Sequence, residues 1–425
     1  MHQHLTLSSK LGAGSLLATL VVSLIILSTC GLLLLALYYF RSAEISDLID
    51  QRLSDDIESA ITLALSDNLI NGTSMRDSTL LFENNNADSV HYSNELWGCF
   101  RAAHVSVSYK RRSKQKAFLY SDSKFLFQNA SLYLADHDRP LSVTGDTYIK
   151  GVVFLPKSGI RSGFFQHMGF SRKNLIEGTI DSSKRQLPPL RTIYRNYFQD
   201  LGNLTFKPIK PAGLADTRQS FSKDCKYIYM SREGIISNQK LSGKIIVFSD
   251  SVLEVRAGAR LKDVLLVAPY IHFSGGFRGT VQAIALDSIS IDQGCVLEYP
   301  SALVGIGRSN SIGSTGSTIT IDSNSTLHGI ALALSPSEKT NIRPVIKIKK
   351  GAEIKGMIYN EGYSYLNGMI NGCIFTHFFF EQRGPMTMEN ILIDAQISPS
   401  KWFQGAALYS IFSESTHRKI IKWLY

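Results

Sequence analysis

The sequence predicts a mainly β protein: an N-terminal transmembrane and amphipathic helix, then an irregular β-rich region, then a parallel β-solenoid, also called a β-helix. Three observations support this fold class: a long uncharged segment near the N-terminus, helical spacing of apolar residues after it, and an 18-residue frame in the C-terminal half. The predicted units are a tail at 1–10, a transmembrane helix at 11–40, an amphipathic stalk helix at 41–70, a β-rich domain at 71–234, the solenoid at 235–383 and a C-terminal cap at 384–425.

The uncharged segment runs from Leu11 to Phe40 and contains no Asp, Glu, Lys, Arg, His, Asn, Gln or Pro. A helix of this length reaches about 45 Å, which exceeds the hydrocarbon core of about 30 Å. A cleaved signal peptide has an apolar core of only about 7–15 residues, and this segment ends in aromatic residues followed by Arg41. We therefore expect an uncleaved, single-pass anchor in the cell membrane, with the large C-terminal part on the extracytoplasmic side.

The residues after the anchor predict that the helix continues to about Asp67 as an amphipathic stalk, with Asn71-Gly72 as a stop. An apolar helix that becomes amphipathic resembles the N-terminal helix of type IV pilins and pseudopilins. In that family a Gly precedes the cleavage point and a Glu lies five residues into the mature helix. Here Thr19 stands at the position of that Glu if cleavage follows Gly14, so a plain signal anchor with a stalk is the favoured alternative.

The β-rich region contains a predicted hairpin with a basic tip. Strands at 105–109 and 117–120 flank a turn that carries five cations in seven residues, in a chain of formal net charge +10. A polyanion such as an acidic glycan, a nucleic acid or a lipid headgroup could bind there, although a solvated turn is the commoner explanation. The predicted polyanion contacts are Lys110, Arg111, Arg112, Lys114 and Lys116.

The C-terminal half repeats the frame apolar-x-apolar-x-x-Gly/Asn. The corner residues are separated by 18, 18, 30 and 27, and the two longer intervals contain polar insertions at 300–317 and 335–344. Alternating apolar residues point inward from a strand, and a Gly or Asn turns the corner at positive φ, so stacked turns would bury one continuous core. The predicted core residues are Val255, Phe273, Ile291, Ile321 and Ile348, and the predicted corners are Gly258, Gly276, Gly294, Asn324 and Gly351.

An antiparallel sandwich is the alternative architecture, because its strands also alternate and turn at glycines. The constant frame favours the solenoid, and over about residues 235–380 it resembles the β-helical surface proteins of bacteria and, more loosely, the bactofilins. The last segment, 384–425, is expected to cap the exposed end, with a helix as one candidate structure at its C-terminus.

Composition and motifs give little sign of catalysis. Five cysteines without a CxxC pair exclude a dense disulfide framework and do not indicate zinc, so we predict no cofactor, metal or catalytic residue. Cys99, Cys225, Cys295 and Cys373 form two disulfides or stay buried thiols.

A polysaccharide lyase or hydrolase would need carboxylates on one exposed face. The column two places before the corners holds only two, and the sequence identifies no orienting partner for His272 or His328. This column reads Arg256, Ser274, Asp292, Asp322 and Lys349.

The sequence therefore predicts a non-enzymatic, membrane-anchored envelope or surface protein for scaffolding, adhesion or the assembly of a pilus-like or secretion-apparatus-like fibre. A carbohydrate-active β-helix enzyme and an anchored polyanion-binding module remain as alternatives. The expected partners are the lipid bilayer, through Leu11 to Phe40, and other envelope or pilus-like proteins or glycans, without specific nucleic-acid binding.

Overall fold

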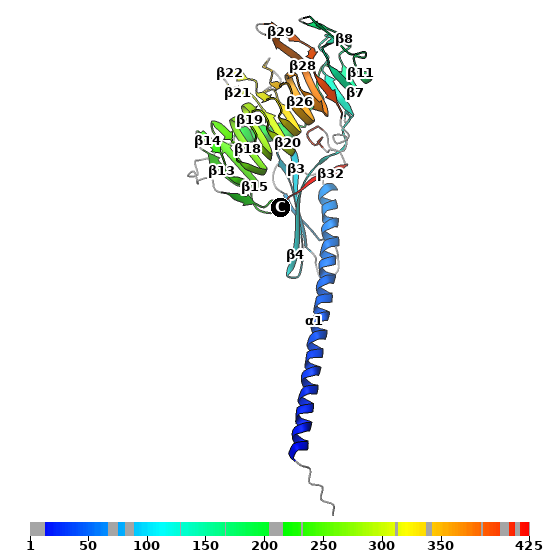
Figure 1. Cartoon of the computed structure of the whole chain (residues 1–425), viewed down its shortest axis with the longest axis vertical. Coiled ribbons are helices and arrows are strands. Elements are labelled where there is room, and N and C mark those ends of the chain that lie inside the picture. Colours follow the sequence, from blue (N-terminus) through cyan, green and yellow to red (C-terminus); the bar gives the residue numbers. More distant parts are fainter. Residues whose placement is uncertain are drawn as a thin grey trace, which may run out of the picture.

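The computed structural model shows a mainly β protein with one long N-terminal helix, a small antiparallel sheet and a large body of parallel strands (Figure 1). The helix projects from one end of the body, so its N-terminal half lies far from all strands. The structure describes residues 13–66, 75–80, 89–127, 129–165, 167–203, 216–230, 233–310, 313–336, 342–383, 386–399, 408–412 and 417–424.

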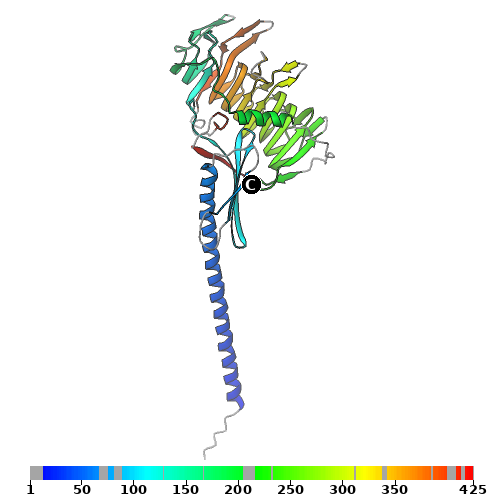
Figure 2. The same ribbon diagram turned by 180° about the vertical axis from the view of Figure 1, so that it is seen from behind.

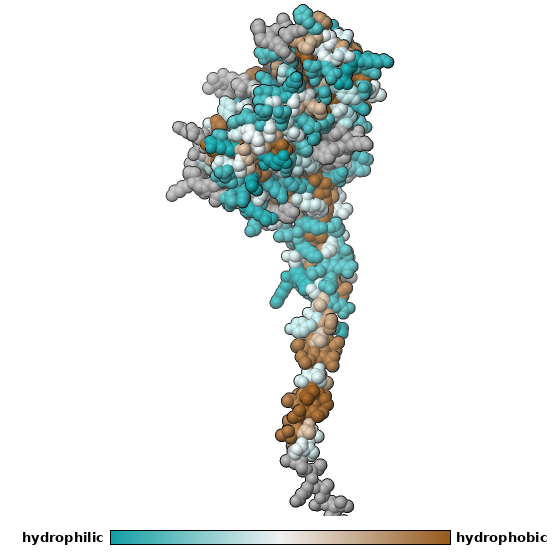
Figure 3. Space-filling view, in the orientation of Figure 1, coloured by the Kyte–Doolittle hydropathy of each residue, from teal (hydrophilic) through white to brown (hydrophobic). Residues whose placement is uncertain are grey.

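Helix α1, Ala13–Ser66, joins the predicted membrane and stalk segments without a break. Its apolar first part is exposed, from Leu16 at 70% to Phe40 at 76%, and appears as the brown part of the projecting helix in Figure 3. Its second part is amphipathic and buries one face against the antiparallel sheet. The buried apolar residues of this part are Leu53, Ile57, Ala60, Ile61 and Ala64, and Asp56 is also buried.

The antiparallel sheet has the order β1-β2-β3-β4-β32. The hairpin predicted around the basic turn is formed by β3 and β4, which pair from Arg101↔Tyr120 to Tyr109↔Arg112. The C-terminus, where a helix was one candidate, forms β32 and pairs with β4 instead, so this part of the expected cap lies on the sheet. The physical reason is that β32 covers the open edge of β4 and packs Trp423 against Phe118 with ring centroids 5.5 Å apart. The strands are β1 Met75–Leu80, β2 Ser89–Trp97, β3 Phe100–Tyr109, β4 Arg112–Asp122 and β32 Arg418–Leu424.

The body is a stack of parallel strands with short elements at its margins. Its main strands are β5 Ala130–Leu134, β7 Tyr148–Leu155, β11 Glu177–Ser182, β12 Thr217–Gln219, β13 Lys226–Met230, β14 Glu233–Ile236, β15 Lys240–Gly243, β16 Ile245–Ser249, β17 Val252–Val255, β18 Arg260–Phe273, β19 Arg278–Ile291, β20 Val296–Gly305, β23 Thr318–Ile321, β24 Thr326–Ala333, β25 Val345–Ile348, β26 Glu353–Leu366, β27 Met369–Asn371, β28 Cys373–Arg383 and β31 Gln396–Ser398. The marginal strands are β6 Leu141–Thr144, β8 Ile160–Ser162, β9 Phe164–Phe165, β10 Met168–Gly169, β21 Arg308–Asn310, β22 Gly313–Thr315, β29 Met386–Glu389 and β30 Ile391–Ile393.

The repeated frame is visible in the strand register. Parallel pairing places the five predicted core residues in one column, and all five are buried. The insertion at 300–317 contains the small β21–β22 hairpin. Because these pairs are parallel, the antiparallel sandwich is excluded for this part of the chain. The column is Val255↔Phe273↔Ile291↔Ile321↔Ile348.

Four predicted corners have the left-handed backbone that the frame requires, with φ between 56° at Asn324 and 82° at Gly276 and Gly351. Gly294 lies between them at 74°. Gly258 departs from the prediction, because its φ is not positive. It is restricted by space instead: a Cβ there would lie 2.1 Å from Asn238 Oδ1.

Long strands connect the sides of the stack. Strand β18 bends at Asp263, whose φ is 62°, and pairs in succession with β15, β16 and β17 of the preceding turn. Such shared strands close the parallel sheet on itself as a barrel. The hydrophobic interior is continuous along the stack, from Ile236 near one end to Leu132 and Val153 near the other.

The N-terminal part of the predicted β-rich domain belongs to the same stack. Strand β5 pairs with β28 through Leu132↔Ile374, β7 pairs with β5, and β11 pairs with β7, all in parallel. Strands β12, β13 and β14 also pair in parallel with β15, β16 and β17, so the stack continues across the boundary expected near residue 234. Two separate chain segments therefore build one body.

Helix α2, Thr192–Gly202, crosses the outside of the stack and covers one of its sides (Figure 2). Tyr194, Phe198 and Leu201 pack there against outward-facing apolar residues of the parallel strands. That side of the stack is thus buried on both faces, which explains uninterrupted apolar runs such as 264–268 and 330–334.

A buried charge cluster joins the helix, the sheet and the body. The Asp122 carboxylate lies 3.6 Å from Arg101 Nη2 and 3.7 Å from Arg418 Nε, and all three side chains are at most 1% exposed. Arg418 Nη1 also donates to Leu65 O at the end of α1, at 2.7 Å. The Asp122 backbone N–H donates to Ser410 Oγ at 2.9 Å, which adds the 408–412 segment to the cluster.

A column of glycines lets neighbouring turns approach closely. Gly329 and Gly356 pair with each other, and their φ values are 149° and 153°. A Cβ at Gly356 would lie 1.9 Å from Gly329 O, and a Cβ at Gly372 would lie 1.8 Å from Gly356 O. Only glycine fits at such positions.

We predict that Gly356→Asn lowers the free energy of unfolding by about 2 kcal/mol or more, because it adds backbone strain and a clash with Gly329. Gly294→Asn is the matched control, because no atom lies within 4 Å of a Cβ there and Asn324 occupies the equivalent corner. Its expected cost is about 1 kcal/mol or less. Thermal melts of the full chain in detergent, followed by circular dichroism, measure both; equal losses would contradict the role of the glycine column.

Asp122→Ala should destabilise the fold by about 3–5 kcal/mol, because it removes the carboxylate that the buried Arg101 and Arg418 share. Glu58→Ala is the control, since the exposed Glu58–Lys116 pair should contribute only about 0–1 kcal/mol. Denaturant melts of the two variants test the difference, and a mild effect of Asp122→Ala would show that the cluster does not hold the parts together.

Candidate functional site

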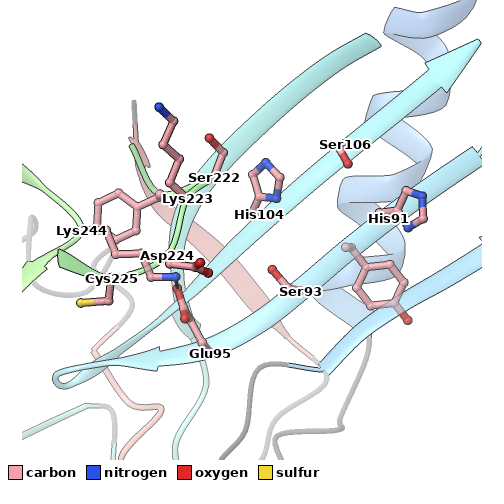
Figure 4. A pocket seen from close by; sticks show the side chains of 12 residues that line it. His91, Ser93, Glu95, His104, Ser106, Ser222, Lys223, Asp224, Cys225 and Lys244 are labelled. Atoms are coloured by element: carbon pink, nitrogen blue, oxygen red, sulfur yellow. Dashed lines mark ion pairs between the residues drawn. The ribbon is translucent and has the colours of Figure 1, made fainter. Parts of the chain in front are cut away.

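The main candidate site is a groove of about 710 Å³ between the antiparallel sheet and the first turns of the stack. Figure 4 shows side chains from β2 and β3 facing residues of the stack across this groove. The sheet contributes His91, Ser93, Glu95, His104 and Ser106, and the stack contributes Phe221, Ser222, Lys223, Asp224, Cys225 and Lys244.

Strand alternation builds the polar wall of the groove. Every second residue of β2 and of β3, such as Val90 and Val105, faces α1 and is buried. The residues between them face the groove. The strand register pairs His91 with Ser106 and Ser93 with His104. The sheet is therefore apolar toward the helix and polar toward the groove.

An ion pair closes one side of the groove. Lys244 Nζ lies 2.7 Å from Glu95 Oε1, and their side chains are 13% and 25% exposed. Burial raises the pKa of the nearby Cys225 thiol to about 11, despite the opposing effect of Lys244. Cys225 is thus a neutral thiol at pH 7 and a poor nucleophile. The side chains that line the groove thus carry hydroxyl, imidazole, carboxylate and ammonium groups, which can form hydrogen bonds with a polar ligand.

The sheet is held against the stack at the turn between β2 and β3. Gln282 Oε1 accepts from Cys99 N–H, and Gln282 Nε2 donates to Trp97 O, each at 2.8 Å. Trp97 Nε1 donates to Asp263 O at 3.3 Å. These contacts join residues far apart in sequence, so the sequence offered no signal for the groove beyond the alternation in its individual strands.

Three of the five predicted polyanion contacts bind α1 instead. Arg112 Nη1 lies 3.3 Å from Asp50 Oδ1, Lys114 Nζ donates to Ser54 Oγ at 2.8 Å, and Lys116 Nζ lies 2.6 Å from Glu58 Oε1. Lys110 and Arg111 are exposed at the turn. The five cations therefore do not form one uniform surface, and polyanion binding by this turn stays a prediction.

In the outward-facing column two places before the corners, the polar side chains also contact their neighbours. His272 Nε2 lies 2.9 Å from Asp292 Oδ2, a partner that the sequence did not reveal because it depends on the pairing of β18 with β19. Lys349 Nζ donates to Asp322 Oδ2 at 2.7 Å and lowers the pKa of that carboxyl. Arg256 pairs with Glu254, and Ser274 Oγ donates to the same carboxylate. Among the described residues, no group of three or more His, Cys, Asp or Glu could hold a metal ion.

All five cysteines lie in the described part of the chain, and they are free thiols. Cys99, Cys295 and Cys373 are buried, and burial raises the pKa of each. Of the two alternatives for the cysteines, the structure has the free thiols.

A second cluster of titratable groups lies where β5 joins the stack. His137 Nε2 and His377 Nδ1 are 3.0 Å apart, and the His137 ring stacks on Phe378 with centroids 4.2 Å apart. The guanidinium of Arg343 lies 4.7 Å from the centroid of the same Phe378 ring. Burial, the neighbouring imidazole and Arg343 lower the pKa of His377 to about 4.

Comparisons with protein families, with curated proteins and with solved structures find no match for this chain. Three features of the structure bear on its function: a polar groove, an exposed apolar helix and a long stack of parallel strands.

We predict that stability falls as the pH drops from about 6.5 toward about 4, because the unfolded chain binds a proton at His377 more readily than the folded chain does. His377→Gln should reduce this loss, whereas His91→Gln, at an exposed position on β2, should leave it unchanged. Melting temperatures of the three proteins across this pH range provide the measurement. An unaltered pH profile in His377→Gln would contradict the assignment.

Proposed function

We propose that this chain is a single-pass membrane protein that holds a β-solenoid away from the bilayer as a structural component of the cell envelope. The observation that carries the proposal is the division of α1. Its first part exposes apolar side chains on all sides, whereas its second part packs on the sheet. A helix that is apolar all round needs a nonpolar environment.

The length and flanks of α1 support an anchor. It is the one helix among the described residues that is long and apolar enough to cross a membrane. Tyr38, Tyr39 and Phe40 lie at the end of its apolar part, where aromatic rings suit the membrane interface. From Phe40 to Leu53, the first helix residue buried at the sheet, α1 rises about 20 Å, which separates the body from the hydrocarbon core.

The continuous ladders support a solenoid with a structural role. A body built from successive turns gains stability from contacts between neighbours and offers a long, stiff surface. Its outward polar columns form local contacts such as the His272–Asp292 hydrogen bond and the Lys349–Asp322 ion pair, which suit a solvated surface better than a catalytic centre. We place this body on the extracytoplasmic side, where the groove could receive another envelope protein or a glycan.

In α1 an exposed apolar part precedes a part that packs on a sheet. This arrangement resembles the one expected from the pilin-like N-terminal sequence. Assembly into a fibre through the apolar part is therefore the most specific form of this proposal. In that form, helices of several copies would pack together while each solenoid faces outward.

The anchor is tested with Leu24→Arg plus Leu34→Arg, which should release the protein from membranes washed with carbonate, because each buried Arg costs about 2.5–3.5 kcal/mol. Leu126→Arg plus Ile180→Arg adds the same charge at exposed positions of the body and should leave the protein in the membrane pellet. Immunoblots of pellet and supernatant measure the distribution. Extraction of the unaltered protein would refute the anchor, and a product shortened by about 14 residues would indicate pilin-type processing.

A further inference from the structure

The β3–β4 hairpin runs alongside α1 and points its turn toward the membrane end of the helix (Figures 1 and 2). Its contacts form a ladder. Lys116 binds Glu58, Lys114 binds Ser54, and Arg112 binds Asp50 and the carbonyl of Ser46, the last at 3.2 Å. Each step toward the turn thus moves the contact toward the N-terminus of α1.

The ladder places the turn relative to the bilayer. From Lys116 to Arg112 the strand covers about 13 Å, and from Glu58 to the level between Ser46 and Asp50 the helix covers about 15 Å. The two elements therefore run nearly parallel. One more strand residue brings the turn to the level of helix residues 44–46, about 6–9 Å beyond Phe40. The headgroup layer extends about 5–8 Å beyond the hydrocarbon core.

The turn presents Lys110 and Arg111 at this level. Both are exposed, and Lys110 Nζ lies 5.0 Å from the centroid of the Tyr109 ring. Asp50 binds Arg112 and so holds the end of the strand against α1. Lys110 and Arg111 project beyond this contact. The exposed acids Glu44 and Asp47 lie on α1 at a similar level, where their charges disfavour anions on their own side of the helix.

We propose that Lys110 and Arg111 bind the phosphates of anionic phospholipid headgroups beside α1, as a second membrane contact of the body. This inference rests on the proposed membrane anchor. Long cationic side chains reach across such a layer, and each cation near an anionic surface contributes about a fivefold preference. A soluble polyanion would have to enter between the body and the membrane, so the position of the turn favours lipid.

The test uses the full chain, purified from membranes that contain phosphatidylglycerol and phosphatidylcholine in equal amounts. Native mass spectrometry then measures which lipids stay bound. The variant Lys110→Asn plus Arg111→Gln removes both charges, and Asn suits the φ of 54° at position 110. Lys157→Gln plus Lys173→Gln removes the same charge from exposed positions on the body.

We expect the unaltered chain and the Lys157/Lys173 control to retain phosphatidylglycerol preferentially, and the Lys110/Arg111 variant to lose about 5- to 30-fold of that preference. Salt at about 0.5 M should weaken the preference of the unaltered chain, because it screens surface charges. Equal retention of both lipids by the unaltered chain, or equal loss in both variants, would overturn the proposal. Binding of an acidic oligosaccharide by the turn, without lipid preference, would also overturn it.

A carbonate wash of the same membranes separates this inference from the anchor. If the Lys110/Arg111 variant stays in the pellet with a normal thermal melt but loses its lipid preference, the anchor and the fold stand and the turn is the lipid contact. If the unaltered chain itself leaves the pellet, the anchor fails and the lipid inference fails with it.

Discussion

The carboxylate of Asp122 lies where the antiparallel sheet, the end of α1 and the 408–412 segment meet. Arg101 from β3 and Arg418 from β32 share its charge, Arg418 also binds the last turn of α1, and the 408–412 segment binds the backbone of Asp122. Burial raises the pKa of the neighbouring Tyr120 to about 12, which reflects how little solvent reaches this site. Such a cluster is costly to desolvate, so its value lies in fixing one arrangement of helix, sheet and C-terminus.

The body depends on a second constraint, the register of its parallel turns. A single turn has too little apolar surface to remain folded, so its stability comes from the turns on either side. Strands β5, β7 and β11 come first in the sequence and pair with one another at one end of the stack. Their contacts with the rest of the stack are made through β28 and β31, which lie more than two hundred residues later. Helix α2 then covers the side that the two segments share. Closing such contacts early is entropically unfavourable, which argues for slow assembly of the complete body.

The sequence was informative where structure is local or periodic. The uncharged span to Phe40 and the column from Val255 to Ile348 follow from composition and spacing, and the pairing register reproduces the column. The addition of β5 to the stack, the docking of β32 on β4 and the opposition of Lys244 and Glu95 across the groove depend on contacts between distant segments, for which no local pattern exists. The basic turn is an intermediate case: its hairpin was predictable, but its pairing with α1 was not, because the stalk charges have no spacing that identifies a partner.

The segment of α1 between its apolar part and the sheet connects these points. Between Phe40 and Leu53 the helix has left its apolar part without yet burying a face on the sheet, and an isolated helical segment of that length is marginal in water. The contacts of Arg112 and Lys114 with Ser46 and Asp50 support the helix laterally within this interval, and those with Ser54 and Glu58 continue this support beyond Leu53. The opposite end of the same sheet is fixed to the stack through Gln282. The antiparallel sheet therefore connects α1 rigidly to the stack, so that the direction in which the body faces follows from the direction of α1.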